Sequence, residues 1–363
     1  MSSVIASMTS RRLDVPLPRP WSPIVRSVAI IAVDIVDSEG RVGHGFSWVP
    51  AIGAGAVHAL LNEDIRDFAI GQPADPESLW PRLWRHLHEA GSGGITTIAM
   101  AGLDLALWDL AARRADSSIS AFLGERRSEV EVYASGINFY YGLKDIQAQS
   151  RRWAKAGYSA VKVKVGRNDV AHDVERVATV RAAMGPECTI MVDANQRWTV
   201  PQAVEALREL QQFDLHWVEE PLRADDLRAH RELRDAIDLP IALGENLYTV
   251  YRFAEYIEAG VVDVIQPNIV RVGGITPFRE IASLAGNGIQ LAPHLLTELS
   301  GQLALTLPDA PIIEDADGND LHSLGLLAEE SPIRIEGARL RSLGRPGLGI
   351  EFVSHTDGDP HGH

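Results

Sequence analysis

Ser159-Ala-Val-Lys-Val-Lys-Val-Gly166 is the stretch from which the rest of the sequence can be interpreted. Its valines alternate with Lys162 and Lys164, a pattern typical of a short strand. Successive side chains of a strand point to opposite faces, so the two lysines share one face. Neighbouring ammonium groups repel and lower each other's pKa, so the pattern predicts an anionic partner or a metal nearby. A solvated basic edge strand is the alternative for this stretch taken alone.

Length and composition exclude several classes of protein. The chain has 363 residues, of which 45% are hydrophobic, and a formal net charge of −15. The length suggests two domains, or one large α/β barrel with an addition. The negative charge argues against nucleic acid or an anionic membrane surface as a partner. Cys188 is the only cysteine, which excludes a disulfide framework and fits a reducing cytoplasm.

The sequence gives no targeting or membrane signal. The first 20 residues lack the apolar core and cleavage site of a signal peptide. We find no run of about 18 apolar residues, so no membrane span is predicted. The tail at 354–363 is predicted to be disordered.

Residues 1–128 are predicted to form an α+β domain, with strands first and helices after them. Two strands joined by turn residues are expected at 25–36 and 41–48, and helices at about 54–70, 76–89 and 95–114. From residue 129 onward, short apolar strands alternate with amphipathic helices. Strand cores are expected at 130–134, 160–165, 189–192, 215–218, 241–243, 262–265, 289–291 and 311–313. Eight strands in such an alternation predict a closed parallel barrel.

The active site of such a barrel lies at the C-terminal ends of its strands. Polar residues occur at these predicted ends, namely Lys162, Lys164, Asp193, Asn195, Glu219, Glu245, Asn268, His294 and Glu314. The steps 193 to 219, 219 to 245 and 268 to 294 are each 26 residues, about one βα unit. The polar residues therefore recur at the same structural place.

Asp193, Glu219 and Glu245 on three adjacent strands would put three carboxylates around one point. Without a cation they would repel each other, and one of them would take up a proton. All-oxygen ligation suits Mg²⁺ first and Mn²⁺ second. One such acid is more often a solvated loop residue or a helix cap, but three on successive strand ends predict a metal site.

The lysines are expected on one side of this metal and His294 on the other. A metal ion and a neighbouring ammonium depress the pKa of a lysine enough to make it a base near neutral pH. Such a lysine can take a proton next to a carboxylate while the metal holds the resulting enediolate. A single histidine is more often structural, but a strand end facing a metal favours a catalytic role.

Together these features resemble the mandelate racemase subgroup of the enolase superfamily. The motifs that carry the resemblance are Ala106-Leu-Trp-Asp-Leu110, Lys-Val-Lys at 162–164, Asp-Ala-Asn-Gln at 193–196, Glu-Glu-Pro at 219–221, Gly-Glu-Asn at 244–246, Arg-Val-Gly-Gly at 271–274 and Pro-Gly-Leu-Gly at 346–349. The resemblance implies a modified TIM barrel, (β/α)7β, at 129–324. It also implies an α+β capping domain at 1–128, completed by about 325–353, and a homo-oligomer built from dimers, up to an octamer.

The resemblance also implies a role for each site residue. Lys164 would be the base and Lys162 would neutralise the carboxylate of a small-molecule substrate. Asn195 would contact a substrate hydroxyl, and Glu314 would hydrogen-bond the developing enediolate. Asp193, Glu219 and Glu245 would hold Mg²⁺. Trp21 and Trp48 are expected where the capping loops meet the substrate, although core packing is an equal alternative for both. Tyr140 follows the first barrel strand and could line the pocket.

Three residues distinguish this sequence from other types within the subgroup. His294 stands where the muconate cycloisomerase type has a lysine, and Asn195 where the galactonate dehydratase type has a histidine. Asn268 replaces the aspartate of the family's His–Asp dyad. Its amide can accept a hydrogen bond from the imidazole but carries no charge to stabilise imidazolium. This favours one base, Lys164, with His294 and Asn268 in subsidiary or substrate-binding roles.

The leading hypothesis is an acid-sugar dehydratase, in which loss of the α proton and the β-hydroxyl yields a 2-keto-3-deoxy sugar acid. A cycloisomerase, racemase or epimerase of a sugar lactone, anhydro-sugar acid or hydroxy acid is the alternative on the same scaffold. A third hypothesis is an inactive acid-sugar-binding protein, for which Asn268 is the only support.

Overall fold

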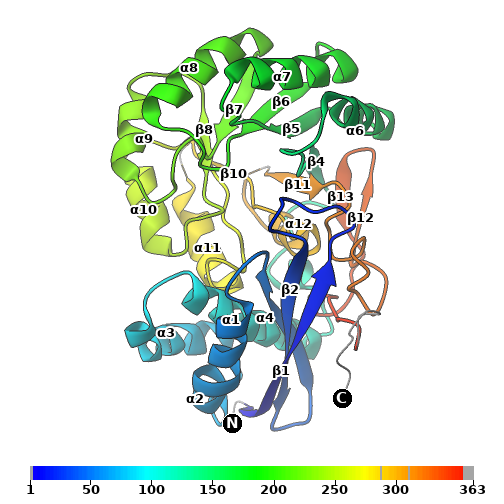
Figure 1. The fold of residues 1–363 in the computed structure, drawn as a ribbon. Helices are drawn as coiled ribbons and strands as arrows, with labels where there is room; N and C mark the ends of the chain where they lie inside the picture. Colours follow the sequence, from blue (N-terminus) through cyan, green and yellow to red (C-terminus); the bar gives the residue numbers. More distant parts are fainter. Residues whose placement is uncertain (1–2, 287, 310, 355–363) are drawn as a thin grey trace.

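The computed structural model describes residues 3–286, 288–309 and 311–354 (Figure 1). The chain begins with an antiparallel sheet in the order β1-β2-β3, formed by β1 (Ile5–Pro16), β2 (Ser27–Asp37) and β3 (Val42–Val49). Strand β1 was not predicted. Its buried residues are irregularly spaced, and the register of its pairing with β2 shifts between Ile5 and Ser7, so no simple alternation marks it.

The helical segments that pack against this sheet are α1 (Ala54–Leu60), a π-helical turn (Leu61–Ile65), α2 (Arg66–Ala69) and α4 (Ile95–Arg114). Helices α3 (Pro76–His86) and α5 (Ile119–Phe122) contact α4. Helix α4 packs against β3 so closely that a Cβ on Gly45 would overlap the carbonyl oxygen of Gly102.

Helix α4 is long and apolar enough to cross a membrane, but 83% of its most apolar window is buried inside the protein. Burial to this extent is typical of a helix in the core of a protein and not of a membrane span. The helix predicted at 95–114 is confirmed. No membrane span was predicted for it, because Asp104 and Asp109 interrupt its apolar residues.

The second part of the chain is a barrel of parallel strands. Its strands are β4 (Val130–Ser135), β5 (Ala160–Lys164), β6 (Thr189–Asp193), β7 (Leu215–Glu219), β8 (Ile241–Leu243), β9 (Val264–Ile265), β10 (Gln290–Leu291) and β11 (Ile312–Ala316). Consecutive strands from β4 to β10 pair in parallel, and β11 pairs in parallel with β4. The connecting helices are α6 (Leu143–Ala156), α7 (Val170–Met184), α8 (Val200–Leu210), α9 (Leu227–Arg234), α10 (Val250–Glu258), α11 (Ile275–Leu284) and α12 (Thr297–Ala304). The predicted (β/α)7β order is confirmed.

Large apolar side chains fill the barrel interior below its polar end. Trp217, Tyr133 and Met191 are fully buried in one cluster. Met191 precedes Asp193 by two residues and Trp217 precedes Glu219 by two, so each pair shares the inner face of its strand. The apolar layer is therefore the floor beneath the two carboxylates.

The segment predicted to complete the capping domain, 325–353, divides between the two parts of the chain. A hairpin of β12 (Ile333–Glu336) and β13 (Arg339–Ser342) extends the barrel sheet, because β13 pairs antiparallel with β4. Phe352 instead packs edge-on against Phe46 of β3, with ring centroids 5.2 Å apart. Of the predicted tail, residues 355–363 lie outside the described ranges.

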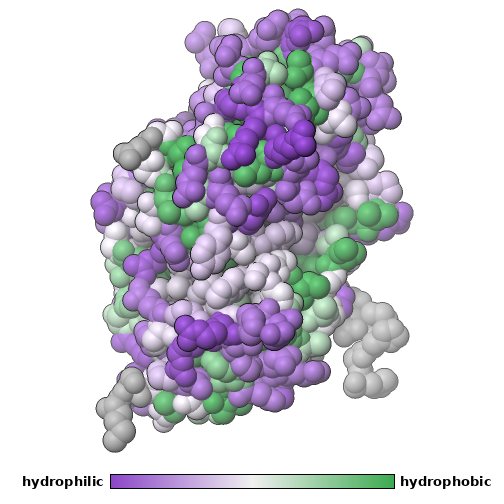
Figure 2. Space-filling view, turned by 90° about the vertical axis from the view of Figure 1, so that its left-hand side faces the viewer, coloured by the Kyte–Doolittle hydropathy of each residue, from purple (hydrophilic) through white to green (hydrophobic). Residues whose placement is uncertain are grey.

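The surface is mixed in hydropathy. On the face shown in Figure 2, hydrophilic residues predominate and hydrophobic ones form small separate groups. Figure 1 shows the N-terminal sheet and its helices packed at one end of the barrel.

Candidate active site

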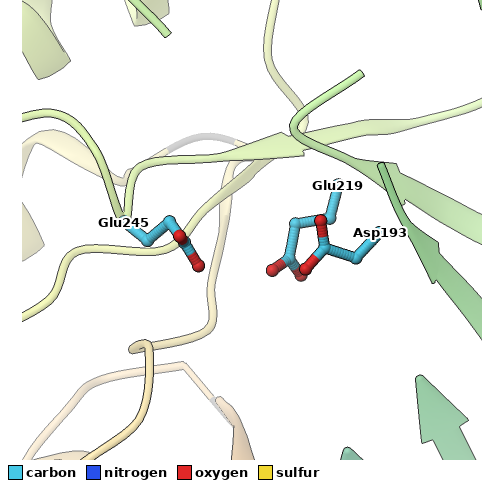
Figure 3. Close-up of side chains that lie close together, drawn as sticks. All are labelled: Asp193, Glu219 and Glu245. Atoms are coloured by element: carbon cyan, nitrogen blue, oxygen red, sulfur yellow. The ribbon is translucent and has the colours of Figure 1, made fainter. Parts of the chain in front are cut away.

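Three carboxylates converge at the C-terminal ends of neighbouring strands. Asp193 ends β6, Glu219 ends β7 and Glu245 follows β8, and their oxygen atoms lie within 4.8 Å of one another. Figure 3 shows Glu245 facing the other two across a common space. All three are buried. Burial raises the pKa of Glu219 to about 8. The charge of Lys162 opposes this rise, and the charge of Asp193 adds to it. Such a buried donor set of hard oxygens fits a divalent cation such as Mg²⁺.

Each lysine of β5 has a carboxylate partner. Lys162 Nζ lies 2.7 Å and 2.8 Å from the two carboxylate oxygens of Glu219 and 2.9 Å from Glu314. Lys164 forms an ion pair with Asp193. Burial lowers the pKa of both lysines, but the carboxylates outweigh it, so both pKa values are raised. The ammonium of Lys162 does lower the pKa of Lys164, as expected, but the charge of Asp193 raises it, so the net pKa is raised. The combined effect of a metal ion and the neighbouring ammonium stays a prediction.

Glu314 of β11 closes this network. Burial alone would raise its pKa, but Lys162 holds the pKa of Glu314 at about 2. The backbone N–H of Leu295 donates a hydrogen bond to its Oε2 over 3.1 Å. Glu314 therefore faces the site as an anion that holds Lys162 in place.

His294 follows β10 and lies opposite the lysines. Its Nε2 is 2.6 Å from Glu245 Oε2 and 3.9 Å from Glu314 Oε2. Behind the ring, Asn268 Nδ2 lies 3.1 Å from Nδ1, while Asn268 Oδ1 accepts a hydrogen bond from the backbone N–H of Arg271. The expectation that this amide accepts a hydrogen bond from the imidazole is wrong, because its nitrogen, a donor, faces Nδ1. The backbone of Arg271 occupies the amide oxygen, so the amide nitrogen faces the ring.

A cavity of about 280 Å³ opens above these groups. Of the predicted residues, its wall contains Lys164, Glu245, His294, Glu314, Asn195, Trp21, Trp48 and Tyr140. Asn268 is fully buried behind His294, outside the described lining of this cavity. Asn195 also supports a carboxylate, because its backbone N–H donates to Asp193 Oδ1 over 2.7 Å.

Sequence reasoning missed two arginines in the cavity wall, Arg197 and Arg271. Arg271 donates hydrogen bonds to the backbone oxygen of Glu245 over 2.8 Å and to Asn246 Oδ1 over 2.7 Å. Arg197 stacks its guanidinium on the ring of Phe139, 3.8 Å from the centroid. A signal was present for both, since each lies three or four residues beyond a predicted strand-end residue.

Two family models match this chain. Residues 11–124 match the N-terminal domain of mandelate racemase and muconate lactonizing enzyme, and residues 145–356 match an enolase C-terminal domain-like model. The 3,6-anhydro-α-L-galactonate cycloisomerase of Streptomyces coelicolor is 36% identical over 88% of each chain. The L-talarate/galactarate dehydratase of Salmonella typhimurium is 36% identical over 79% of this chain and 73% of its own.

A solved structure agrees with these matches. The crystal structure of a racemase from Streptomyces coelicolor with bound magnesium superposes with a TM-score of 0.90 at 34% identity, covering 96% of this chain and 97% of its own. The barrel, the three strand-end carboxylates and the family models point to one conclusion. The chain belongs to the mandelate racemase and muconate lactonizing enzyme family of the enolase superfamily.

Proposed function

We propose that this protein removes the proton α to the carboxylate of an acid sugar and then expels the β-hydroxyl, giving a 2-keto-3-deoxy sugar acid. The observation that carries the proposal is the position of Lys164 on the cavity wall, in an ion pair with Asp193 of the carboxylate triad. A base is thereby held beside the point where a substrate carboxylate would be bound.

Asp193, Glu219 and Glu245 would hold Mg²⁺ in this proposal. When bound, the ion would act as a Lewis acid on the substrate carboxylate and make its α proton more acidic. Residues of the chain itself carry out the proton transfer and stabilise the charge that develops. Lys162, fixed between Glu219 and Glu314, neutralises negative charge that develops on the carboxylate. Lys164 takes the α proton. Asp193, which otherwise keeps this lysine protonated, would be drawn away from it as a ligand of a divalent cation.

His294 would assist the departing hydroxyl in this scheme. Its Nδ1 accepts from Asn268, so its proton is on Nε2, the nitrogen that points toward Glu245. A neutral imidazole in this tautomer is a hydrogen-bond donor toward the cavity. It can therefore stabilise a leaving oxygen without itself serving as the base.

Proton NMR in D₂O with Mg²⁺ tests the proposal on hexarates, hexonates, pentonates and their lactones. With one class of acid we expect loss of the α-proton signal and a new C3 signal from a CHD group, because the enol takes up a deuteron from D₂O as it becomes the keto acid. Lys164→Ala should lower the rate about 10²–10⁴-fold, while Lys155→Ala, an exposed lysine of α6, should not change it. Near wild-type turnover by Lys164→Ala would contradict the proposal.

Cycloisomerisation is the second candidate, favoured by the similarity to the Streptomyces coelicolor cycloisomerase. Product mass separates the two, because elimination of the ring oxygen of an anhydro-sugar acid or lactone also gives a 2-keto-3-deoxy acid, but without loss of water. Binding without any exchange at the α carbon would instead indicate an inactive acid-sugar-binding protein.

The proposal includes a cytoplasmic homo-oligomer built from dimers, as implied by the family resemblance. The single cysteine, Cys188, is buried and unpaired, which is consistent with a reducing compartment. Light scattering coupled to size exclusion measures the oligomeric state, and a monomeric mass would contradict this part of the proposal.

A further inference from the structure

Arg197 is a cation in the cavity wall whose charge no described carboxylate neutralises. The other basic side chains of the wall are engaged: Lys164 pairs with Asp193, His294 contacts Glu245, and Arg271 contacts Glu245 and Asn246. Within the described ranges, no carboxylate oxygen lies within 4.0 Å of the Arg197 guanidinium. Its five donors are therefore available to a ligand in the cavity.

The backbone that carries Arg197 is firmly held. Asn195 and Gln196 both have left-handed backbone conformations, with φ of 43° and 62°. The side chain of Gln196 spans the turn, accepting from the N–H of Ala224 over 2.9 Å and donating to Glu220 over 3.2 Å. The N–H of Arg197 itself donates to the Ala194 oxygen over 3.2 Å. This loop therefore presents Arg197 from a fixed position.

The side chain is also packed along its length. Its guanidinium stacks on Phe139, and its stem lies against Gly166, where an added Cβ would lie 2.9 Å from Cδ and 3.1 Å from Cβ of Arg197. Gly166 also has a φ of +99°. Both this left-handed conformation and the close contact with Arg197 disfavour a side chain at this position. A guanidinium held on an aromatic ring loses less freedom when it binds an anion.

The position of Arg197 suits an anion at the far end of a substrate. Gly166, which its stem contacts, is two residues from Lys164, and two extended residues span at most about 7 Å. The terminal carbons of a six-carbon sugar acid are about 6 Å apart, from five C–C bonds of about 1.5 Å each. With one carboxylate at the lysines and the carboxylate triad, the other end of such a molecule reaches the Arg197 side of the cavity.

We infer that Arg197 forms a distal carboxylate subsite, so that the substrate is a sugar diacid (an aldaric acid) and not a sugar monoacid. This inference rests on the proposed function, which it deepens by naming the substrate class. A planar guanidinium recognises a carboxylate through two parallel hydrogen bonds, which a terminal CH₂OH group cannot reproduce. Arg197 is thus a specificity-determining residue for the far end of the substrate.

The test uses acids that differ only at that end: galactarate with galactonate, and glucarate with gluconate. Calorimetry on Mg²⁺-loaded Lys164→Ala protein measures affinity without turnover. We expect the diacid of at least one pair to bind about 10–100-fold more tightly than its monoacid, the range for a hydrogen-bonded charged pair. Adding Arg197→Met should abolish that preference and leave the monoacid affinity unchanged. Arg208→Met, an exposed arginine on α8 of the same βα unit, is the matched control.

Arg197→Lys separates charge from shape, and we expect it to restore only part of the preference, because an ammonium lacks the planar fork. Equal affinity for diacid and monoacid in every pair, or an equal loss of both in Arg197→Met, would overturn the inference. The proposed function fails differently, by binding without α-proton exchange in protein that retains Lys164.

Discussion

The amide nitrogen of Asn268 lies 3.1 Å from Nδ1 of His294, and the Arg271 backbone keeps the amide oxygen turned away from the ring. Nδ1 is therefore an acceptor and the imidazole proton is on Nε2. In this tautomer Nε2 is the nitrogen that can donate a hydrogen bond toward Glu245 and the cavity. Lys164 is left as the one proton-accepting base in the cavity.

Asn268→Asp should restore a carboxylate behind the imidazole and let His294 accept a proton at Nε2. We expect the wild type to exchange the α proton of only one of two C2-epimeric acids in D₂O. The variant should gain exchange of the other epimer by at least about 10-fold, since general-base catalysis contributes about 10²–10⁴-fold. Deuterium incorporation followed by NMR measures both rates. Similar exchange of both epimers by the wild type would show that His294 acts as a base despite Asn268.

Trp21 connects the segment between β1 and β2 to the loop that follows β11. Its Nε1 donates to Asn319 Oδ1 over 2.7 Å, and its ring lies 6.0 Å from that of Trp48, centroid to centroid. Trp21→Phe keeps an aromatic ring but loses the donor. We expect KM to rise about 2–10-fold with little change in kcat, the range for one hydrogen bond.

Asn319→Ala should have the same effect, because it removes the other partner of this bond. If the bond is the cause, the double variant should show no further rise in KM. Steady-state kinetics on all three proteins decide this. Unchanged KM in both single variants would mean that the contact does not hold the segment over the substrate.

The barrel and the positions of its strand-end residues could be predicted because both depend on period and spacing. Asp193, Glu219 and Glu245 follow one another at one βα unit, and parallel strands bring such residues to one end. Strand β1 could not be predicted in this way. Its residues at the bulge break the alternation, and charged residues such as Arg12 and Asp14 face solvent along it.

Pairing within the site depends on side-chain geometry that spacing does not encode. Lys162 and Lys164 share one face, as predicted, yet each meets a different carboxylate. Arg197 reaches the cavity through two left-handed residues, Asn195 and Gln196. Non-glycine residues rarely adopt this conformation, so a sequence pattern gives little warning of it.

The buried carboxyl group of Glu298, on α12, should make the free energy of unfolding depend on pH. Burial raises its pKa to about 8, and Asp320 adds to the rise. The folded state therefore favours the protonated acid, so the free energy of unfolding should fall as pH rises from about 4.5 to about 8 and change no further above that. Glu298→Gln should weaken this dependence, because its amide stays neutral.

Thermal unfolding at pH 5.5 and pH 8.5 measures the effect of Glu298. The wild type should lose more thermal stability between these two values than Glu298→Gln. Glu280→Gln is the control, since Glu280 lies near the surface of α11. An equal loss in the wild type and both variants would mean that Glu298 does not titrate in this range.

Asp109, within the Ala106–Leu110 motif of α4, joins three parts of the chain. Its carboxylate accepts hydrogen bonds from the N–H of His44 over 2.9 Å, the N–H of Leu348 over 2.6 Å and Arg113 Nε over 2.7 Å. The side chain is fully buried. It approaches Gly347 so closely that a Cβ there would overlap its carboxylate. One residue thereby ties β3 and the C-terminal segment to α4.

Asp109→Ala would leave two backbone donors and one guanidinium nitrogen without their acceptor. Removing one partner of such a buried charged network costs about 3–5 kcal/mol of the free energy of unfolding. Urea denaturation followed by circular dichroism measures this loss. Asp67→Ala, an exposed aspartate of α2, should change the stability little. If the two variants unfold at the same urea concentration, Asp109 does not hold the three parts together, and the motif must be explained by helix packing alone.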